Sequence, residues 1–126
     1  MCYNNYMNYD YIDKLLDSLS RSKFRGSFHL NDKMKNYCFE KGLDTVKSHA
    51  YDFINKNLKP KDIINDGKQT PMKQVHPVFI ARHATGTCCR GGLERIHHIP
   101  KNKELTNEEV DYAIEVIMRW IKREIK

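Results

Sequence analysis

The segment after Leu105 carries the strongest folding signal in the sequence. Its apolar residues recur at helical spacing through Val110, Ile114, Ile117, Ile121 and Ile125. Thr106 and Glu109 just before them match a capping box, in which each side chain satisfies a free backbone amide at the start of a helix. The pattern predicts a long amphipathic helix, which requires other elements to cover its apolar face.

Three earlier segments show the same spacing. Residues 10–21, 31–42 and 43–58 each present one apolar face, with Asn31 as a helix cap and Gly42 as a stop. Residues 78–84 predict a short helix or strand, and Thr85 or Thr87 is expected to cap a helix that runs to residue 96. We therefore expect an all-α or mainly α fold of about five helices.

The chain length of 126 residues suits one compact domain. We expect residues 1–23 to form an N-terminal extension and first helix, and residues 24–126 the globular domain. No apolar run is long enough to cross a membrane and the N-terminus does not read as a leader, so we expect a cytoplasmic protein. Because Cys88 and Cys89 are neighbours, which rarely bridge each other, reduced thiols are expected.

Positive charge is concentrated late in the chain. The net charge is +6, and residues 73–103 contain six Lys or Arg residues against the single acid Glu94. Such a stretch favours anionic partners, although an ordinary basic surface is the alternative. The predicted contacts to nucleic acid or phosphate are Lys68, Lys73, Arg82, Arg90, Arg95, Lys101 and Lys103.

The same stretch is rich in imidazole and thiol groups, which are the usual ligands of zinc. We predict that His83, Cys88, Cys89 and His97 are the candidate metal ligands, although their spacing matches no known zinc finger. Alternatively, Cys88 or Cys89 near a helix start is a reactive nucleophile with His83 or His97 as its base. The simplest alternative is that these residues are hydrogen-bonded or buried in the core.

Two further features could bind phosphate. Arg90, Gly91 and Gly92 would place free amides and a guanidinium at a helix start. Residues 89–117 have the outline of a helix-hairpin-helix, in which Lys101 and Lys103 would contact phosphates. The glycines usual on both sides of such a hairpin are absent, because His98 and Asn102 stand there.

Residues 59–77 form the longest segment without periodicity. Turn signals such as Asp66-Gly67 mark it as a loop, and loops of this length often have functions as lids or rims. We expect the part that carries Asp66 and Lys68 to close over the imidazoles and thiols. A passive connector is the alternative.

Several segments together resemble a known family: FRGSFHLNDK, GLDTVKSHAYDFI, NDGKQTPMKQ, HPVFIARHATGTCCRGGLERIHHIPKNKELT and VIMRWI. They resemble short bacterial proteins grouped as domain of unknown function 4186, and the resemblance covers residues 24–121. It implies no activity, but it implies that NDGKQTP and HPVFIARHATGTCC belong to one shared site or fold signature. The polar and thiol positions of that pattern are Asp66, Lys68, Gln69, His76, His83, Thr87, Cys88, Cys89, Arg90, His97, Pro100 and Lys101.

The chain departs from the family pattern at two positions. Gly92 stands where the pattern has a third cysteine, and Ile96 stands where it has tryptophan before His97. If a metal site used the third cysteine, this chain would lack one ligand. The resemblance therefore weakens the zinc hypothesis.

Three functions follow as hypotheses. The first is a small nucleic-acid- or phosphate-binding protein that uses the basic residues, with the His/Cys cluster organising the site. The second is a metal- or thiol-dependent hydrolase that uses His76, His83, Cys88, Cys89 and His97. The third is a protein-interaction module or an inhibitor of a nucleic-acid enzyme, for which the sequence contains no specific motif.

Overall fold

A computed structural model describes residues 9–63, 66, 68 and 70–126. This part of the chain contains six α-helices, one short 3-10 helix and no strand. The predicted all-α fold is thus confirmed. Residues 78–84, for which the sequence allowed a helix or a strand, lie in a helix.

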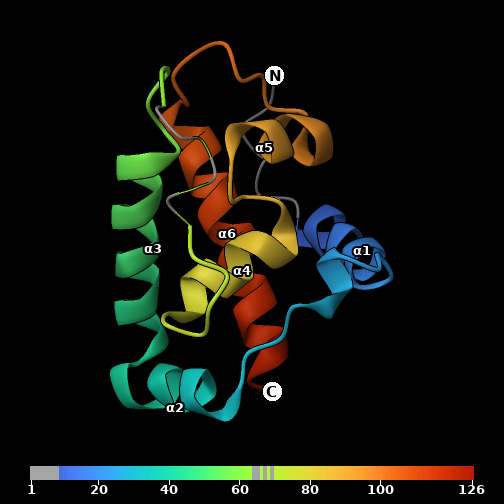
Figure 1. The fold of residues 1–126 in the computed structure, drawn as a ribbon, viewed down its shortest axis with the longest axis vertical. Coiled ribbons are helices and arrows are strands. Elements are labelled where there is room, and N and C mark those ends of the chain that lie inside the picture. The colour runs from blue at the N-terminus through green and yellow to red at the C-terminus, as the bar shows by residue number, and fades with distance from the viewer. Residues whose placement is uncertain (1–8, 64–65, 67, 69) are drawn as a thin grey trace.

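The elements follow one another in a simple order. They are α1 (Tyr9–Ser20), η2 (Arg25–Ser27), α2 (Asp32–Lys41), α3 (Leu43–Asn57), α4 (Pro77–Thr85), α5 (Arg90–His97) and α6 (Asn107–Glu124). Figure 1 shows α4 and α6 crossing in the middle, with α3 along one side, α1 on the other and α2 across one end. Helix α5 lies at the opposite end from α2.

Helix α6 begins and packs as its sequence predicts. The Thr106 hydroxyl accepts from the Glu109 amide at 3.1 Å, and the Glu109 carboxylate accepts from the Thr106 amide at 2.9 Å. Its apolar face is buried against α3, α4 and α1 through Val110, Ile114, Ile117 and Ile121. Burial of this face therefore organises most of the core.

Helix α4 is short, yet nearly all of its residues are buried. It packs against α1, α2, α3, α6 and η2. Pro77 occupies its first turn, where no amide is lost, and Gly86 ends it with a left-handed φ of 74°. A helix that is enclosed on all sides brings any polar side chain it carries into the protein interior.

Helix α5 does not begin as predicted. Its cap is Cys89, whose sulfur accepts from the Gly92 amide at 3.3 Å. The predicted caps serve a different purpose, because the Thr85 hydroxyl donates to Ala81 O at 2.7 Å and lies 3.0 Å from the Thr87 hydroxyl. These two threonines close the end of α4.

The first helix belongs to the same core as the rest. Ile12 and Leu16 are buried in it, and Arg119 of α6 holds the Asp13 carboxylate with two hydrogen bonds of 2.8 and 3.1 Å. No helix in the described part is long and apolar enough to span a membrane.

Candidate functional site

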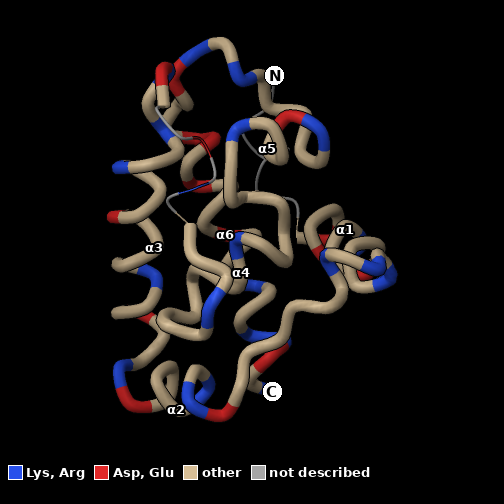
Figure 2. The backbone as a smooth tube through the Cα atoms, viewed as in Figure 1, with Lys and Arg blue, Asp and Glu red and all other residues tan. Residues whose placement is uncertain are grey.

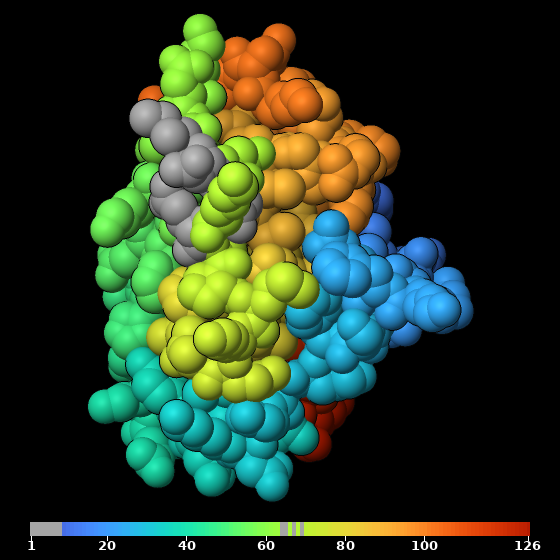
Figure 3. Space-filling view, in the orientation of Figure 1, coloured from blue at the N-terminus to red at the C-terminus, as the bar shows by residue number. Residues whose placement is uncertain are grey.

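The candidate residues gather around the turn between α4 and α5. In Figure 3 the segment that leads into α4 lies on the visible face, between α3 and the segment around η2. The gold segment after α4, which leads into α5, reaches the same face beside it, whereas the end of α4 is buried. The candidate residues therefore lie among chain segments that are far apart in sequence.

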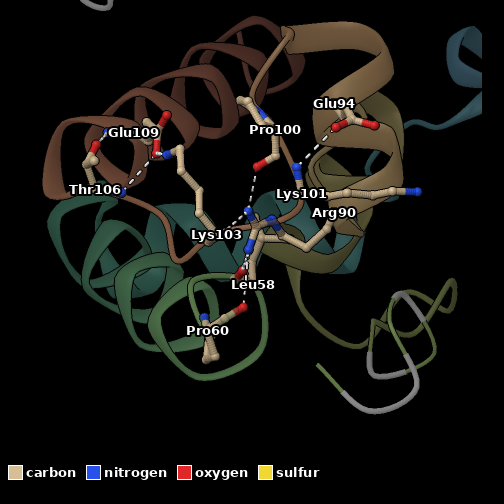
Figure 4. Close-up of polar contacts among 9 residues, drawn as sticks. All are labelled: Leu58, Pro60, Arg90, Glu94, Pro100, Lys101, Lys103, Thr106 and Glu109. Atoms are coloured by element: carbon tan, nitrogen blue, oxygen red, sulfur yellow. Dashed lines mark hydrogen bonds and ion pairs between the residues drawn. The ribbon is translucent and has the colours of Figure 1, made fainter. Parts of the chain in front are cut away.

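Arg90 is a structural residue rather than a surface contact. Its side chain is 3 % exposed. Its two terminal nitrogens donate to four backbone carbonyls, those of Leu58, Pro60, Pro100 and Lys103, at 2.7–3.2 Å (Figure 4). The guanidinium of Arg90 is therefore occupied in joining two loops, the one after α3 and the one between α5 and α6, and is not placed at the surface where the prediction has it meet an external anion.

Asp66 occupies the start of α5. Its two carboxylate oxygens accept from the Arg90 backbone amide at 2.9 and 3.1 Å. A carboxylate is well placed at the positive end of a helix, where a phosphate would otherwise bind. The loop thus reaches α5 as expected, but it fills the predicted phosphate position at Arg90, Gly91 and Gly92.

Arg82 is a buried cation with free donors. It is 0 % exposed, and its Nε donates to Thr87 O at 2.9 Å. Neither of its terminal nitrogens has a hydrogen-bond partner among the residues that the structure describes. Burial lowers its pKa to about 10, while the negative charge available on Cys88, Cys89 and Asp66 acts in the opposite direction. Arg82 is therefore buried and not placed at the surface, where the prediction has it meet a partner.

Cys88 lies between α4 and the segment that follows α1. Its sulfur is 3.7 Å from Arg25 Nη1, and the same nitrogen donates to His83 O at 2.7 Å. The Thr70 hydroxyl donates to Cys88 O at 3.3 Å. Contacts from both sides fix the position of the thiol.

The environment of Cys88 favours its thiolate form. A hydrogen bond from Cys89 and the charges of Arg25 and Arg82 lower the pKa of Cys88 to about 6, although burial acts in the opposite direction. The pKa of Cys89 is raised by the same hydrogen bond and by burial. The two thiols therefore ionise as a pair, and the charges of Arg25 and Arg82 favour the negative charge on Cys88. We call Arg25, Arg82, Cys88 and Cys89 the thiol site.

The predicted metal ligands do not converge. His97 uses both ring nitrogens, because Nε2 donates to Thr85 O at 2.7 Å and Nδ1 accepts from the Tyr112 hydroxyl at 2.7 Å. His83 Nε2 donates to Thr70 O at 2.8 Å. The described residues include no group of three or more His, Cys, Asp or Glu side chains that could hold a metal ion.

His76 has a capping role outside the thiol site. Its Nδ1 accepts from the Val78 amide at 3.0 Å at the start of α4, so its other nitrogen, Nε2, carries the proton and donates to His49 Nδ1 at 3.0 Å. Burial, with a smaller contribution from His49, lowers the pKa of His76 to about 4. This histidine is neutral and helps to fix the helix that carries Arg82 and His83.

The remaining predicted cations differ in exposure. Lys68, Lys73, Arg95 and Lys101 are exposed, whereas Lys103 is bonded to Glu109 at 2.8 Å. In Figure 2, Lys and Arg positions are spread over the fold and interspersed with Asp and Glu. Four of the seven predicted contacts thus remain available to an outside partner.

Sequence reasoning missed two members of the surroundings of Cys88. Arg25 is separated from it by 63 positions and Thr70 by 18, and neither belongs to the basic stretch. The FRGSF segment that contains Arg25 appeared in the family resemblance without a role. Only the packing of η2 against α4 reveals that role.

Comparison with known proteins gives a family but no activity. A family model described as a domain of unknown function (DUF4186) matches residues 13–122, which is nearly the whole chain. No solved structure matches the fold. The function must therefore be argued from the residues themselves.

Proposed function

The chain belongs to the family of domain of unknown function 4186, and because that description names no activity, we propose from the site itself that the protein is a thiol-dependent enzyme with Cys88 as nucleophile. The observation that carries this proposal is the buried guanidinium of Arg82, whose terminal nitrogens have no hydrogen-bond partner within the described part of the chain. The thiolate of Cys88 supplies the negative charge that balances this guanidinium.

Arg82 holds its guanidinium in the protein interior. An unpaired ion in a protein interior is expensive, and buried charges are therefore found with a partner of opposite sign. The groups whose negative charge favours the protonated form of Arg82 are Cys88, Cys89 and Asp66. Asp66 is already bonded to the α5 amide, and Cys89 retains its proton, so the Cys88 thiolate is the available counterion.

A cysteine that is already a thiolate needs no catalytic base. The thiolate, not the thiol, attacks electrophiles, and a cysteine stabilised by arginines requires no neighbouring base to remove its proton. This removes the need for the His97 base of the hydrolase hypothesis, whose two nitrogens are engaged elsewhere. The thiol version of that hypothesis therefore has support as far as the nucleophile is concerned.

The pH dependence of alkylation tests this proposal. We expect iodoacetamide to modify Cys88 with a rate that rises through a midpoint near pH 6, where the lowered pKa lies. Cys38 provides an internal comparison, because burial raises the pKa of its thiol. Tandem mass spectrometry of peptides, at pH values from about 5 to 9, would assign each rate to one sulfur.

The matched control is Cys88→Ser, in which the fast reaction should disappear. A Cys88 rate that rises only above about pH 8, as for an ordinary cysteine, would contradict the proposal. Assignment of the fast reaction to Cys89 would also contradict the proposal.

A second candidate function is binding of nucleic acid or another phosphate-bearing ligand. It is favoured by Lys68, Lys73, Arg95 and Lys101, which are exposed and form no ion pair within the described residues. Such contacts hold phosphates without reading sequence. They would bind at the surface, apart from the buried thiol site.

Salt-dependent anisotropy tests this second function. We expect labelled DNA or RNA to bind with an affinity that falls as salt rises, and Lys73→Gln with Lys101→Gln to reduce the salt slope by about 2. A matched pair of exposed cations on α2, Lys33→Gln with Lys41→Gln, should leave the slope unchanged. If neither single- nor double-stranded nucleic acid shows salt-sensitive binding, this function is excluded.

A further inference from the structure

The enclosure of the thiol site limits what can reach it. Cys88 is 8 % exposed, and backbone and side-chain contacts hold it on both sides. A side chain of a macromolecule would have to displace these contacts to reach the sulfur. The electrophile that suits such a thiolate is therefore small.

The positive charges around the sulfur further limit the class of electrophile that suits the thiolate. When a thiolate attacks a peroxide, negative charge moves from sulfur to the departing oxygen, and hydrogen-bond donors already in place stabilise it. The two terminal nitrogens of Arg82 donate to no group of the described residues, and Arg25 Nη1 lies 3.7 Å from the sulfur. Arg25 thus contacts the nucleophile directly, and the charge of Arg82 also acts on it, since it helps to lower the pKa of Cys88.

Resting on the thiolate role of Cys88, we propose that the substrate of the thiol site is a small hydroperoxide. The sulfur of Cys88 attacks the nearer oxygen, the O–O bond breaks, and sulfur is oxidised as the peroxide is reduced. Cys88 becomes a sulfenic acid, and the departing oxygen takes a proton from the Cys89 thiol to leave as water or an alcohol. The negative charge remains in the site as the Cys89 thiolate, beside Arg82.

The second sulfur is a proton donor rather than a convenient disulfide partner. Consecutive Cα atoms are about 3.8 Å apart across a trans peptide, which is shorter than the roughly 4.4–6.8 Å that disulfides span. Closing a bond between Cys88 and Cys89 would also withdraw the sulfur that caps α5 at the Gly92 amide. The expected product is therefore the sulfenic acid of Cys88.

Peroxide treatment with trapping tests the inference. The full chain would be exposed to hydrogen peroxide at pH 7 in the presence of dimedone, and the adduct would be located by tandem mass spectrometry. We expect the adduct on Cys88, formed at least about tenfold faster than on free cysteine. Arg25→Gln should slow it by about tenfold through loss of one donor, whereas Arg21→Gln, at an exposed position, should not.

The comparison with alkylation separates the two proposals. If iodoacetamide modifies Cys88 with a midpoint near pH 6 but peroxide reacts no faster than with free cysteine, the hydroperoxide inference fails and the thiolate proposal stands. If both reactions are slow, both fail. A Cys88–Cys89 disulfide in place of the adduct would overturn the assignment of Cys89 as proton donor only. Because Arg25 is half-buried, circular dichroism would verify that Arg25→Gln is folded before its rate is compared.

Discussion

Arg90→Met should lower the free energy of unfolding by about 3–5 kcal/mol, a large part of the stability of a domain this size. The guanidinium of Arg90 donates to four carbonyls in two separate loops, those of Leu58 and Pro60 after α3 and those of Pro100 and Lys103 before α6. Methionine fills similar space but donates nothing, so buried carbonyls are left without partners. The backbone amide that Asp66 caps is unchanged, so the effect reports on the side chain.

Urea unfolding followed by circular dichroism would measure this loss. Arg95→Met is the matched control, because Arg95 lies on the same helix and is exposed. It should change the stability by no more than about 0.5 kcal/mol. Equal effects of the two substitutions would show that the carbonyl cluster contributes little.

Acidification from pH 7 to pH 4.5 should cost the protein about 2–3 kcal/mol through His97 alone. Burial lowers the pKa of His97 to about 4 from an ordinary value of 6.5. The unfolded chain therefore takes up a proton below pH 6.5 while the folded chain does not, and stability falls with pH until the folded pKa is reached. The lowered pKa of His76 acts in the same direction.

The slope of stability against pH identifies the responsible ring. In His97→Gln the stability should depend less on pH between 6.5 and 4.5, even though its value at pH 7 is lower. His98→Asn is the neighbouring control, since His98 is exposed and asparagine tolerates its positive φ of 60°. If His97→Gln kept the full slope, the proton uptake would have to be assigned elsewhere.

The helices were predictable because their signals are local. The capping box of α6, the Asn31 cap and Gly42 stop of α2, and the apolar stripes all lie within single segments. The start of α5 was not predictable, because either threonine has the right chemistry to cap a helix. Their use in closing α4 depends on how tightly Gly86 turns the chain.

The sequence predicted several residues of the site correctly, but it did not predict what their side chains contact. The sequence placed Cys88, Cys89 and Asp66 in one region, and the structure places Asp66 at the helix that Cys89 caps. It could not indicate that Arg82 and Arg90 point inward, because arginine is usually a surface residue and net charge carries no direction. Nor could it reveal Arg25, whose contact spans 63 positions.

Because Arg25 lies on η2, the reactivity of Cys88 depends on a segment that is separate from the packed helices α3, α4 and α6. Its guanidinium is half-buried and reaches the sulfur from a short segment between α1 and α2, which the Phe28 ring anchors by stacking on His83 at 5.5 Å. Displacement of this segment alone would remove one positive charge from the sulfur while α3, α4 and α6 stay packed. A binding partner that displaces η2 would thus lower the reactivity of the Cys88 thiolate while the rest of the fold stays intact.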